Sequence, residues 1–274
     1  MPELPEVESL RRSLEPHILG RTLLSTELYF PRLRWELPKE ALNKLCKGKP
    51  RLLKLERRAK YLLFCFDDES VLISHLGMSG QWLVDHRFEP GNHMHVVLNF
   101  GGKHLIYRDP RRFGMLDVSC RSKLSEHPRL MALGPEPLSE GFSVEACWSG
   151  LRSTRVAIKL WLMNAKNVVG VGNIYASEAL YLAGIRPTLR ANQLSKRRFA
   201  RLIETVKQVI GQAIESGGTT LQDYRNAEGS EGAFQSRLKV YGREGEPCQA
   251  CGTLIRKVVL GQRSTFYCRT CQMR

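Results

Sequence analysis

Long apolar runs are missing from this sequence of 274 residues. No stretch approaches the roughly 18 apolar residues that a membrane span requires, so we do not expect a membrane protein. The first residues, MPELPEVE, are acidic and rich in proline, whereas a signal peptide opens with basic and then apolar residues. We therefore expect a cytoplasmic protein. Internal repeats and low-complexity tracts are also lacking, which argues against a fibrous protein.

Acidic residues are scarce relative to basic ones. The chain has 27 Asp and Glu against 42 Lys and Arg, which gives a formal net charge of +15. Such an excess in a globular chain favours a polyanionic partner, most often nucleic acid. The alternative is a basic protein without such a partner, and charge alone does not separate the two. Hydrophobic residues make up 42% of the chain, which is typical of a globular fold.

The eight cysteines divide into two groups. Four share no spacing and are interpreted as packing thiols: Cys46, Cys65, Cys120 and Cys147. The other four form a C-x2-C-x16-C-x2-C pattern near the end of the chain: Cys248, Cys251, Cys268 and Cys271. This spacing is typical of a four-cysteine zinc site, although two disulfides are the alternative. Four thiolates leave no open coordination position, so we predict one structural Zn2+ on a β-hairpin.

Hydrophobic periodicity predicts an α+β fold with three regions. In residues 1–130, apolar residues recur at helical spacing from Val7 to Ile18, with Pro5 as a start signal and Gly20 as an end signal. Short runs rich in β-branched and aromatic residues follow, within 22–30, 51–66, 70–84, 94–100 and 103–109. We expect an N-terminal helix and an antiparallel β-sandwich, with a barrel as the alternative.

The second region, 136–238, changes to a helical period. Helices are predicted within 155–165, 173–184 and 196–216, with Asn173 as the N-cap of the second and Gly184 near its end. Residues 217–238 are rich in Gly and polar residues and predict a loop. The third region, 241–274, is the predicted zinc module.

Several short motifs, taken in order, resemble the bacterial formamidopyrimidine-DNA glycosylase family, also called 8-oxoguanine DNA glycosylase. They span nearly the whole chain: PELPEVE at 2–8, RRAKYLL at 57–63, HLGMSG at 75–80, DPRRFG at 109–114, VVGVGNIYASEAL at 168–180, GGTT at 217–220, VYGR at 240–243 and the four cysteines.

The resemblance implies a monomeric bifunctional glycosylase and abasic-site lyase of base excision repair. Such an enzyme excises 8-oxoguanine and formamidopyrimidines from double-stranded DNA, with no catalytic metal or organic cofactor. An endonuclease VIII-like glycosylase for oxidised pyrimidines and a non-catalytic zinc DNA-binding protein are the alternatives. The resemblance also implies that 136–238 holds a helix–two-turn–helix element and a loop that closes over the lesion.

Four residues become candidate catalytic groups through the resemblance. Pro2 would become the nucleophile once Met1 is removed, which a small second residue generally permits. An α-amine titrates near pKa 8, against about 10.4 for lysine, so more of it is nucleophilic at neutral pH. Glu3 would move protons, Lys60 would assist base release, and Arg263 would grip the phosphates beside the lesion.

The resemblance also marks residues that would contact DNA. Met78, Arg111 and Phe113, called the void-filling set below, match residues that occupy the gap left by the extruded base. Asn173 would bind a phosphate at the start of its helix. Four further residues are weaker candidates for backbone contacts: His75, His93, Arg155 and Tyr241.

Overall fold

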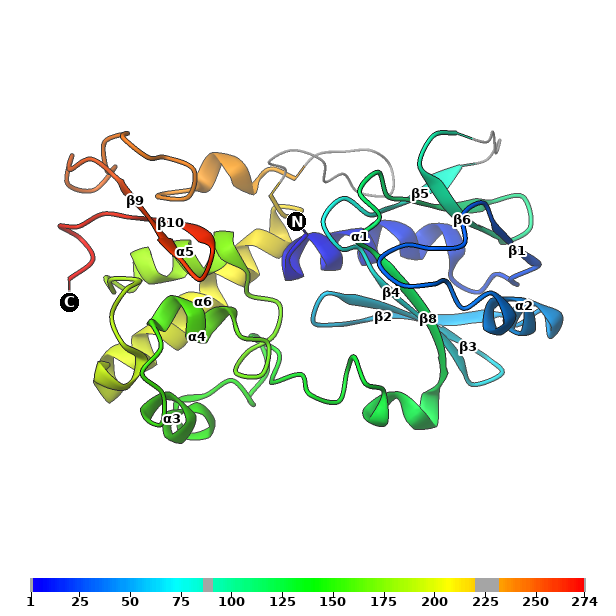
Figure 1. Ribbon diagram of the computed structural model, residues 1–274, viewed down its shortest axis with the longest axis horizontal. Coiled ribbons are helices and arrows are strands. Elements are labelled where there is room, and N and C mark those ends of the chain that lie inside the picture. Colours follow the sequence, from blue (N-terminus) through cyan, green and yellow to red (C-terminus); the bar gives the residue numbers. More distant parts are fainter. Residues whose placement is uncertain (1, 86–90, 220–231, 274) are drawn as a thin grey trace. The chain divides into compact units, whose positions relative to one another are not determined.

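The computed structural model describes residues 2–85, 91–219 and 232–273 (Figure 1). The chain divides into two compact units. The first comprises Met1–Ala132 with Ser216–Ala233, and the second comprises Leu133–Glu215 with Phe234–Arg274. The loop predicted at 217–238 includes residues 220–231, which lie outside the described residues. The three regions expected from the sequence, 1–130, 136–238 and 241–274, stay a prediction.

The first unit contains two antiparallel four-stranded sheets. One has the order β1-β6-β7-β5, formed by Ser25–Leu28, Met94–Asn99, His104–Arg108 and Gln81–Asp85. The other has the order β2-β3-β4-β8, formed by Leu52–Arg58, Tyr61–Phe66, Ser70–His75 and Met115–Cys120. Both sheets contribute side chains to one core, so the predicted sandwich is confirmed.

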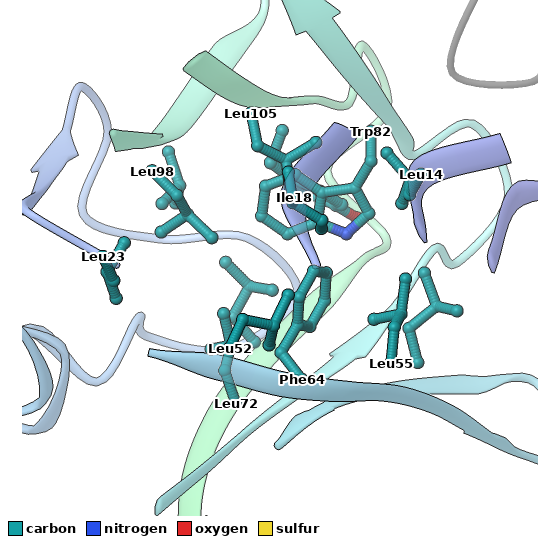
Figure 2. Close-up of a cluster of buried hydrophobic side chains, with 14 of the residues drawn as sticks. Leu14, Ile18, Leu23, Leu52, Leu55, Phe64, Leu72, Trp82, Leu98 and Leu105 are labelled. Carbon is teal, nitrogen blue, oxygen red and sulfur yellow. The ribbon is translucent and has the colours of Figure 1, made fainter. Parts of the chain in front are cut away.

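Helix α1, Leu4–Ile18, runs through that core. Its buried residues Leu14 and Ile18 meet Trp82 of β5 and Phe64 of β3, which belong to different sheets (Figure 2). The rings of Phe64 and Trp82 pack edge to face with centres 5.6 Å apart, and the Trp82 indole N–H donates to Ser74 Oγ at 2.9 Å. The helix therefore joins the two layers.

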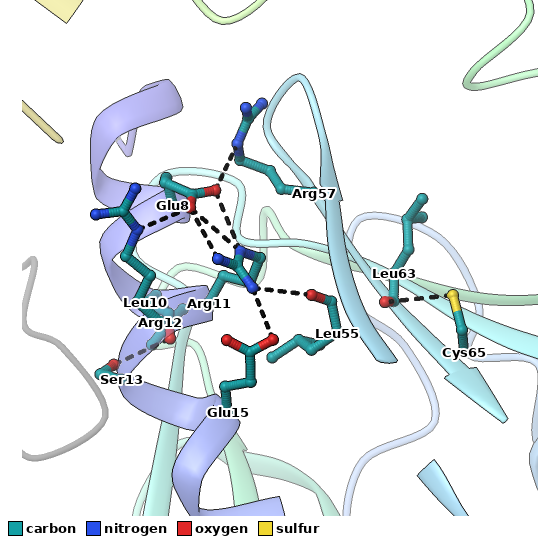
Figure 3. Close-up of polar contacts among 10 residues, drawn as sticks. All are labelled: Glu8, Leu10, Arg11, Arg12, Ser13, Glu15, Leu55, Arg57, Leu63 and Cys65. Carbon is teal, nitrogen blue, oxygen red and sulfur yellow. Dashed lines mark hydrogen bonds and ion pairs between the residues drawn. The ribbon is translucent and has the colours of Figure 1, made fainter. Parts of the chain in front are cut away.

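A partly buried ion network fixes α1 to strand β2 (Figure 3). The Glu8 carboxylate accepts from Arg11, Arg12 and Arg57, the last at 3.1 Å from β2. Burial opposes ionisation of Glu8, but the hydrogen bonds from Arg11 and Arg12 outweigh it and lower the pKa of the carboxyl. Glu8 therefore remains ionised and holds the helix in one orientation on the sheet.

Two elements of this unit were not anticipated from the sequence. Helix α2, Lys39–Lys47, buries only Leu42 and Leu45, so its helical period is too short to detect. Strand β8, Met115–Cys120, is buried at its first two residues and then becomes partly exposed. Its alternation is weak because β8 is a sheet edge, paired on one side with β4.

The second unit consists of helices followed by a β-hairpin. The helices are α3 Val144–Arg152, α4 Ile158–Met163, α5 Asn173–Leu182 and α6 Lys196–Glu215, and the hairpin strands are β9 Arg256–Leu260 and β10 Arg263–Tyr267. Helices α4, α5 and α6 and the hairpin agree with the prediction, whereas α3 was not anticipated from the sequence. Gly184 follows α5 with φ +67°, as expected of an end signal. Within the described ranges, every helix is too short or too polar to cross a bilayer.

Strand β2 offers a matched test of the core. Leu55 is 2% exposed and Leu53 is 46% exposed on the same strand. We expect Leu55→Ala to lower the free energy of unfolding by about 2–5 kcal/mol, since it leaves a cavity, and Leu53→Ala to change it by less than about 0.5 kcal/mol. Urea unfolding followed by tryptophan fluorescence measures both. Equal effects would contradict the core assignment.

Candidate functional site

The first turn of α1 buries the N-terminal segment. Pro2 is buried and Glu3 is 2% exposed. Glu6, also buried, accepts from the Glu3 backbone N–H at 2.7 Å through one carboxylate oxygen and from the Thr219 N–H at 2.8 Å through the other. A Cβ at Gly218 would lie 2.8 Å from Glu6 Oε1, so the backbone at Gly218 approaches this carboxylate closely. Glu6 therefore sets the path of residues 2–3.

Lys60 lies in the two-residue turn between β2 and β3, after Ala59 at φ +55°. The next residue, Tyr61, pairs with His75 across the sheet, and their rings are 4.8 Å apart. Lys60 and His75 are therefore brought to the same end of this sheet. The neighbouring Arg57 is committed to the Glu8 carboxylate and to the Ala59 carbonyl, so it serves the fold at this end of the sheet.

His75 is held as a neutral imidazole. Its Nδ1 accepts the Gly77 N–H at 3.0 Å, which leaves the ring proton on Nε2. Burial, followed by the positive charges of Lys60, Arg34 and Arg129, lowers the pKa of His75 from 6.5 to about 4. At neutral pH this side chain can donate one hydrogen bond but carries no charge.

The void-filling set occupies two loops whose backbones touch. Met78 is half-buried in the loop after β4, while Arg111 and Phe113 are exposed in the loop after β7. A Cβ at Gly77 would overlap the Phe113 carbonyl, so glycine is required for this approach. The Arg111 guanidinium lies 5.2 Å from the centre of the Phe113 ring. His93 is exposed, and its carbonyl accepts the Asp109 N–H.

In the second unit, Asn173 is brought together with Tyr241 and the hairpin. Asn173 is the first residue of α5 and Gly172 is the N-cap, so the predicted N-cap role of Asn173 is wrong. The side chain instead turns to tertiary partners. Its Nδ2 donates to the Ser264 carbonyl at 3.0 Å and to the Tyr241 hydroxyl at 3.4 Å. Ser264 follows Arg263, which is exposed at the start of β10.

Two buried charged residues support this arrangement and were missed in the sequence. Lys159 is fully buried on α4 and donates to Asn173 Oδ1 at 2.5 Å and Thr265 Oγ1 at 2.8 Å. Glu178 on α5 accepts the backbone N–H groups of 239–241, and burial raises its pKa. A charge inside an apolar helical run was the available signal. Arg155 is exposed, three residues before α4 begins.

The four C-terminal cysteines form a compact cluster. Their Sγ atoms lie within 4.8 Å of one another, with Cys248–Cys271 at 3.9 Å and Cys251–Cys268 at 3.5 Å. Tetrahedral Zn–S bonds of about 2.3 Å place sulfurs about 3.8 Å apart, whereas a disulfide requires about 2.05 Å. The donor set fits one structural zinc ion, as predicted.

Three family models match the chain. The formamidopyrimidine-DNA glycosylase N-terminal domain matches residues 1–116. The formamidopyrimidine-DNA glycosylase H2TH domain matches residues 133–225. A zinc finger found in FPG and IleRS matches residues 245–274.

Full-length relatives carry the same family name. A formamidopyrimidine-DNA glycosylase of Aromatoleum aromaticum is 48% identical, with all of both chains covered, and one of Thioalkalivibrio sulfidiphilus is 47% identical over 99% of this chain and 100% of its own. Among solved structures, a complex between Lactococcus lactis Fpg and DNA containing an abasic site is 36% identical, with a TM-score of 0.92 over 99% of this chain and 100% of that one.

The zinc assignment predicts metal content. Purified protein should contain one zinc per chain, and Cys268→Ser should lose nearly all of it, because a structural site needs all four ligands. Mass spectrometry of the bound metal measures this. The control is Cys120→Ser, which removes an exposed cysteine outside the cluster and should keep the zinc. Full zinc in Cys268→Ser would contradict the assignment.

The environment of His75 predicts a shifted titration. Its NMR ring signal, identified by its loss in His75→Gln, should titrate near pH 4. Since the unfolded state takes up this proton more readily, the His75 contribution to folding should be constant above pH 6.5 and become less favourable as pH falls from 6.5 to 4. A midpoint between 6 and 7 would contradict the structure.

Proposed function

The chain belongs to the formamidopyrimidine-DNA glycosylase family, and we propose that it excises oxidised purines from double-stranded DNA and then cleaves the strand. The observation that carries this proposal is the buried N-terminal turn. Pro2 and Glu3 are held together at the start of α1 by the Glu6 carboxylate. A nucleophile and a proton-transfer group in fixed proximity are what covalent glycosidic cleavage needs.

Pro2 acts as the nucleophile in this proposal. After Met1 is removed, the secondary amine attacks C1′ of the damaged nucleotide, the glycosidic bond breaks, and the base leaves with a proton. The sugar ring then opens: the C1′–O4′ bond breaks, O4′ takes up a proton, and the resulting cationic iminium acidifies the C2′ hydrogen. Loss of that proton expels the 3′ phosphate, and a second elimination expels the 5′ phosphate. Hydrolysis then frees Pro2 and leaves a one-nucleotide gap.

Glu3 and Lys60 serve the proton transfers. Glu3 adjoins the amine in the chain and is almost fully buried, and a carboxyl group shielded from water transfers protons efficiently to nearby atoms. Lys60 assists base release and elimination from the turn between β2 and β3. Arg263, exposed on the hairpin, grips the phosphates that flank the lesion, where a planar guanidinium can bind two oxygens at once.

The void-filling set replaces the extruded base. Flipping a nucleotide costs a few kcal/mol of stacking and pairing, and an apolar wedge limits collapse of the gap. Met78 and Phe113 supply the wedge, and Arg111 hydrogen-bonds the orphaned base. Five further residues contact the sugar-phosphate backbone of the DNA: His75, His93, Arg155, Asn173 and Tyr241.

Excision of damaged bases requires access to the chromosome, so we place the protein in the bacterial cytoplasm, bound to the nucleoid.

The proposed nucleophile predicts a covalent intermediate. Borohydride should trap the wild-type protein on duplex DNA containing 8-oxoguanine, since it reduces the iminium to a stable amine. We expect Pro2→Gly to lower trapping about tenfold or more, because a secondary amine is replaced and the turn loses its rigid residue. Denaturing gel electrophoresis measures the adduct.

The control for this trapping experiment is Pro31→Gly, which alters an exposed proline in the same unit and should trap normally. An undiminished adduct with Pro2→Gly would exclude Pro2 as the nucleophile. Intact-mass measurement checks that Met1 is absent, as the mechanism requires.

The proposed substrate class predicts a preference. Under single-turnover conditions, 8-oxoguanine opposite cytosine should be excised at least about tenfold faster than thymine glycol, because pockets that pair polar groups reject mismatched ligands strongly. Faster excision of thymine glycol would favour the endonuclease VIII-like alternative. DNA binding without cleavage of either substrate would favour a non-catalytic protein.

A further inference from the structure

Asp109 is a completely buried carboxylate at the point where three loops meet. One oxygen accepts the Ser79 hydroxyl at 2.6 Å, from the loop after β4. The other accepts the Gly114 N–H at 2.8 Å, from the loop after β7. The same residue therefore links the loop that carries Met78 to the end of the loop that carries Arg111 and Phe113.

The backbone of Asp109 extends the junction to the segment before β6. Its N–H donates to the His93 carbonyl at 3.0 Å, and its carbonyl contacts His95 Nε2 at 2.8 Å. The carbonyl also accepts the Arg112 N–H at 3.2 Å. The void-filling set and His93 thus lie on segments that meet at one residue.

Ser79 adds a directional link between the two void-filling loops. Its hydroxyl donates to the Asp109 carboxylate, which can only accept, and it accepts the Arg111 backbone N–H at 3.2 Å. Neither partner can reverse its role while the carboxylate is ionised. The hydroxyl therefore has one orientation, and the backbone of Arg111 is tied to the neighbour of Met78.

Close backbone packing leaves these loops little freedom. A Cβ at Gly80 or at Gly114 would overlap the Tyr107 hydroxyl, so both loops rest on the same phenol. Tyr107 is fully buried on β7, and its hydroxyl donates to the His75 carbonyl at 3.3 Å. The floor under the loops belongs to the rigid sandwich core.

We propose that Asp109, acting through Ser79 and the Gly114 N–H, is a positioning residue that holds the void-filling set preassembled for base extrusion. This inference rests on the proposed function. In a reaction that depends on positioned groups, a displacement of about 1 Å can cost about 100-fold in rate. The carboxylate offers a separate oxygen to each of two donors from different loops, whereas an amide at this position would turn its NH2 group toward one of them.

The test compares a reaction that needs the void-filling set with a reaction that does not. One substrate is duplex DNA with 8-oxoguanine opposite cytosine, and the other is single-stranded DNA with an abasic site, which has no opposite base. We expect Asp109→Asn to lower single-turnover excision on the duplex about tenfold or more and to leave cleavage of the single strand within about twofold. Both are measured well below the melting temperature.

Two further variants complete the experiment. Ser79→Ala should show the same selective loss, and the double variant should lose less than the product of the single effects, because both residues act through one hydrogen bond. Ser79→Ala also carries the test if Asp109→Asn does not fold. The matched control is Ser74→Ala, which removes a buried hydroxyl that pairs with Trp82 in the same unit and should leave the ratio of the two activities unchanged.

Each outcome decides the proposal. A selective loss on the duplex in Ser79→Ala or Asp109→Asn, absent from Ser74→Ala, supports it. Equal losses on both substrates, the same selective loss in Ser74→Ala, or unchanged duplex excision would overturn it. If the wild-type protein cleaves neither substrate, the proposed function itself fails. If the wild type is active and the variants keep the wild-type ratio, only the positioning role of Asp109 fails.

Discussion

The burial of helix α1 against strands of both sheets is the constraint on which the first unit depends. The helix contributes one apolar face to the shared core, and the Glu8 network fixes its orientation on β2. Because the helix begins at Leu4, this packing also fixes Pro2 and Glu3 at the N-terminal end. The same apolar burial that stabilises the sandwich therefore places the buried residues Pro2 and Glu3 side by side at this end of the helix.

Three buried carboxylates hold neighbouring segments in place by accepting hydrogen bonds from their backbone N–H groups. Glu6 binds the N–H groups of Glu3 and Thr219, Glu178 binds those of 239–241, and Asp109 binds that of Gly114. Removing a carboxylate from water costs free energy unless the carboxylate is hydrogen-bonded. The conformation in which each of these carboxylates keeps its N–H donors is therefore strongly favoured. Their shared effect is to tie loop backbones to the helices and sheets around them.

The sequence predicted elements whose signals are local. The period of α1 and α6, the end signal at Gly184 and the spacing of the four cysteines lie within short windows, so they were found. Partners distant in the chain could not be found this way. Asn173 was predicted to cap the N-terminus of its own helix, whereas its side chain donates to the Ser264 carbonyl. The roles of Lys159, Glu178 and Asp109 depend on residues 30 or more positions away, and motif resemblance supplied the candidate catalytic residues.

In the mechanism that we propose, the packing of α1 presents the Pro2 amine as the group that attacks the sugar. The most direct measurement is peptide mapping of the borohydride-trapped wild-type complex by mass spectrometry, after digestion of protein and DNA. We expect the sugar remnant on the nitrogen of Pro2, in a peptide that lacks Met1. A remnant on Lys60 or another lysine would contradict it.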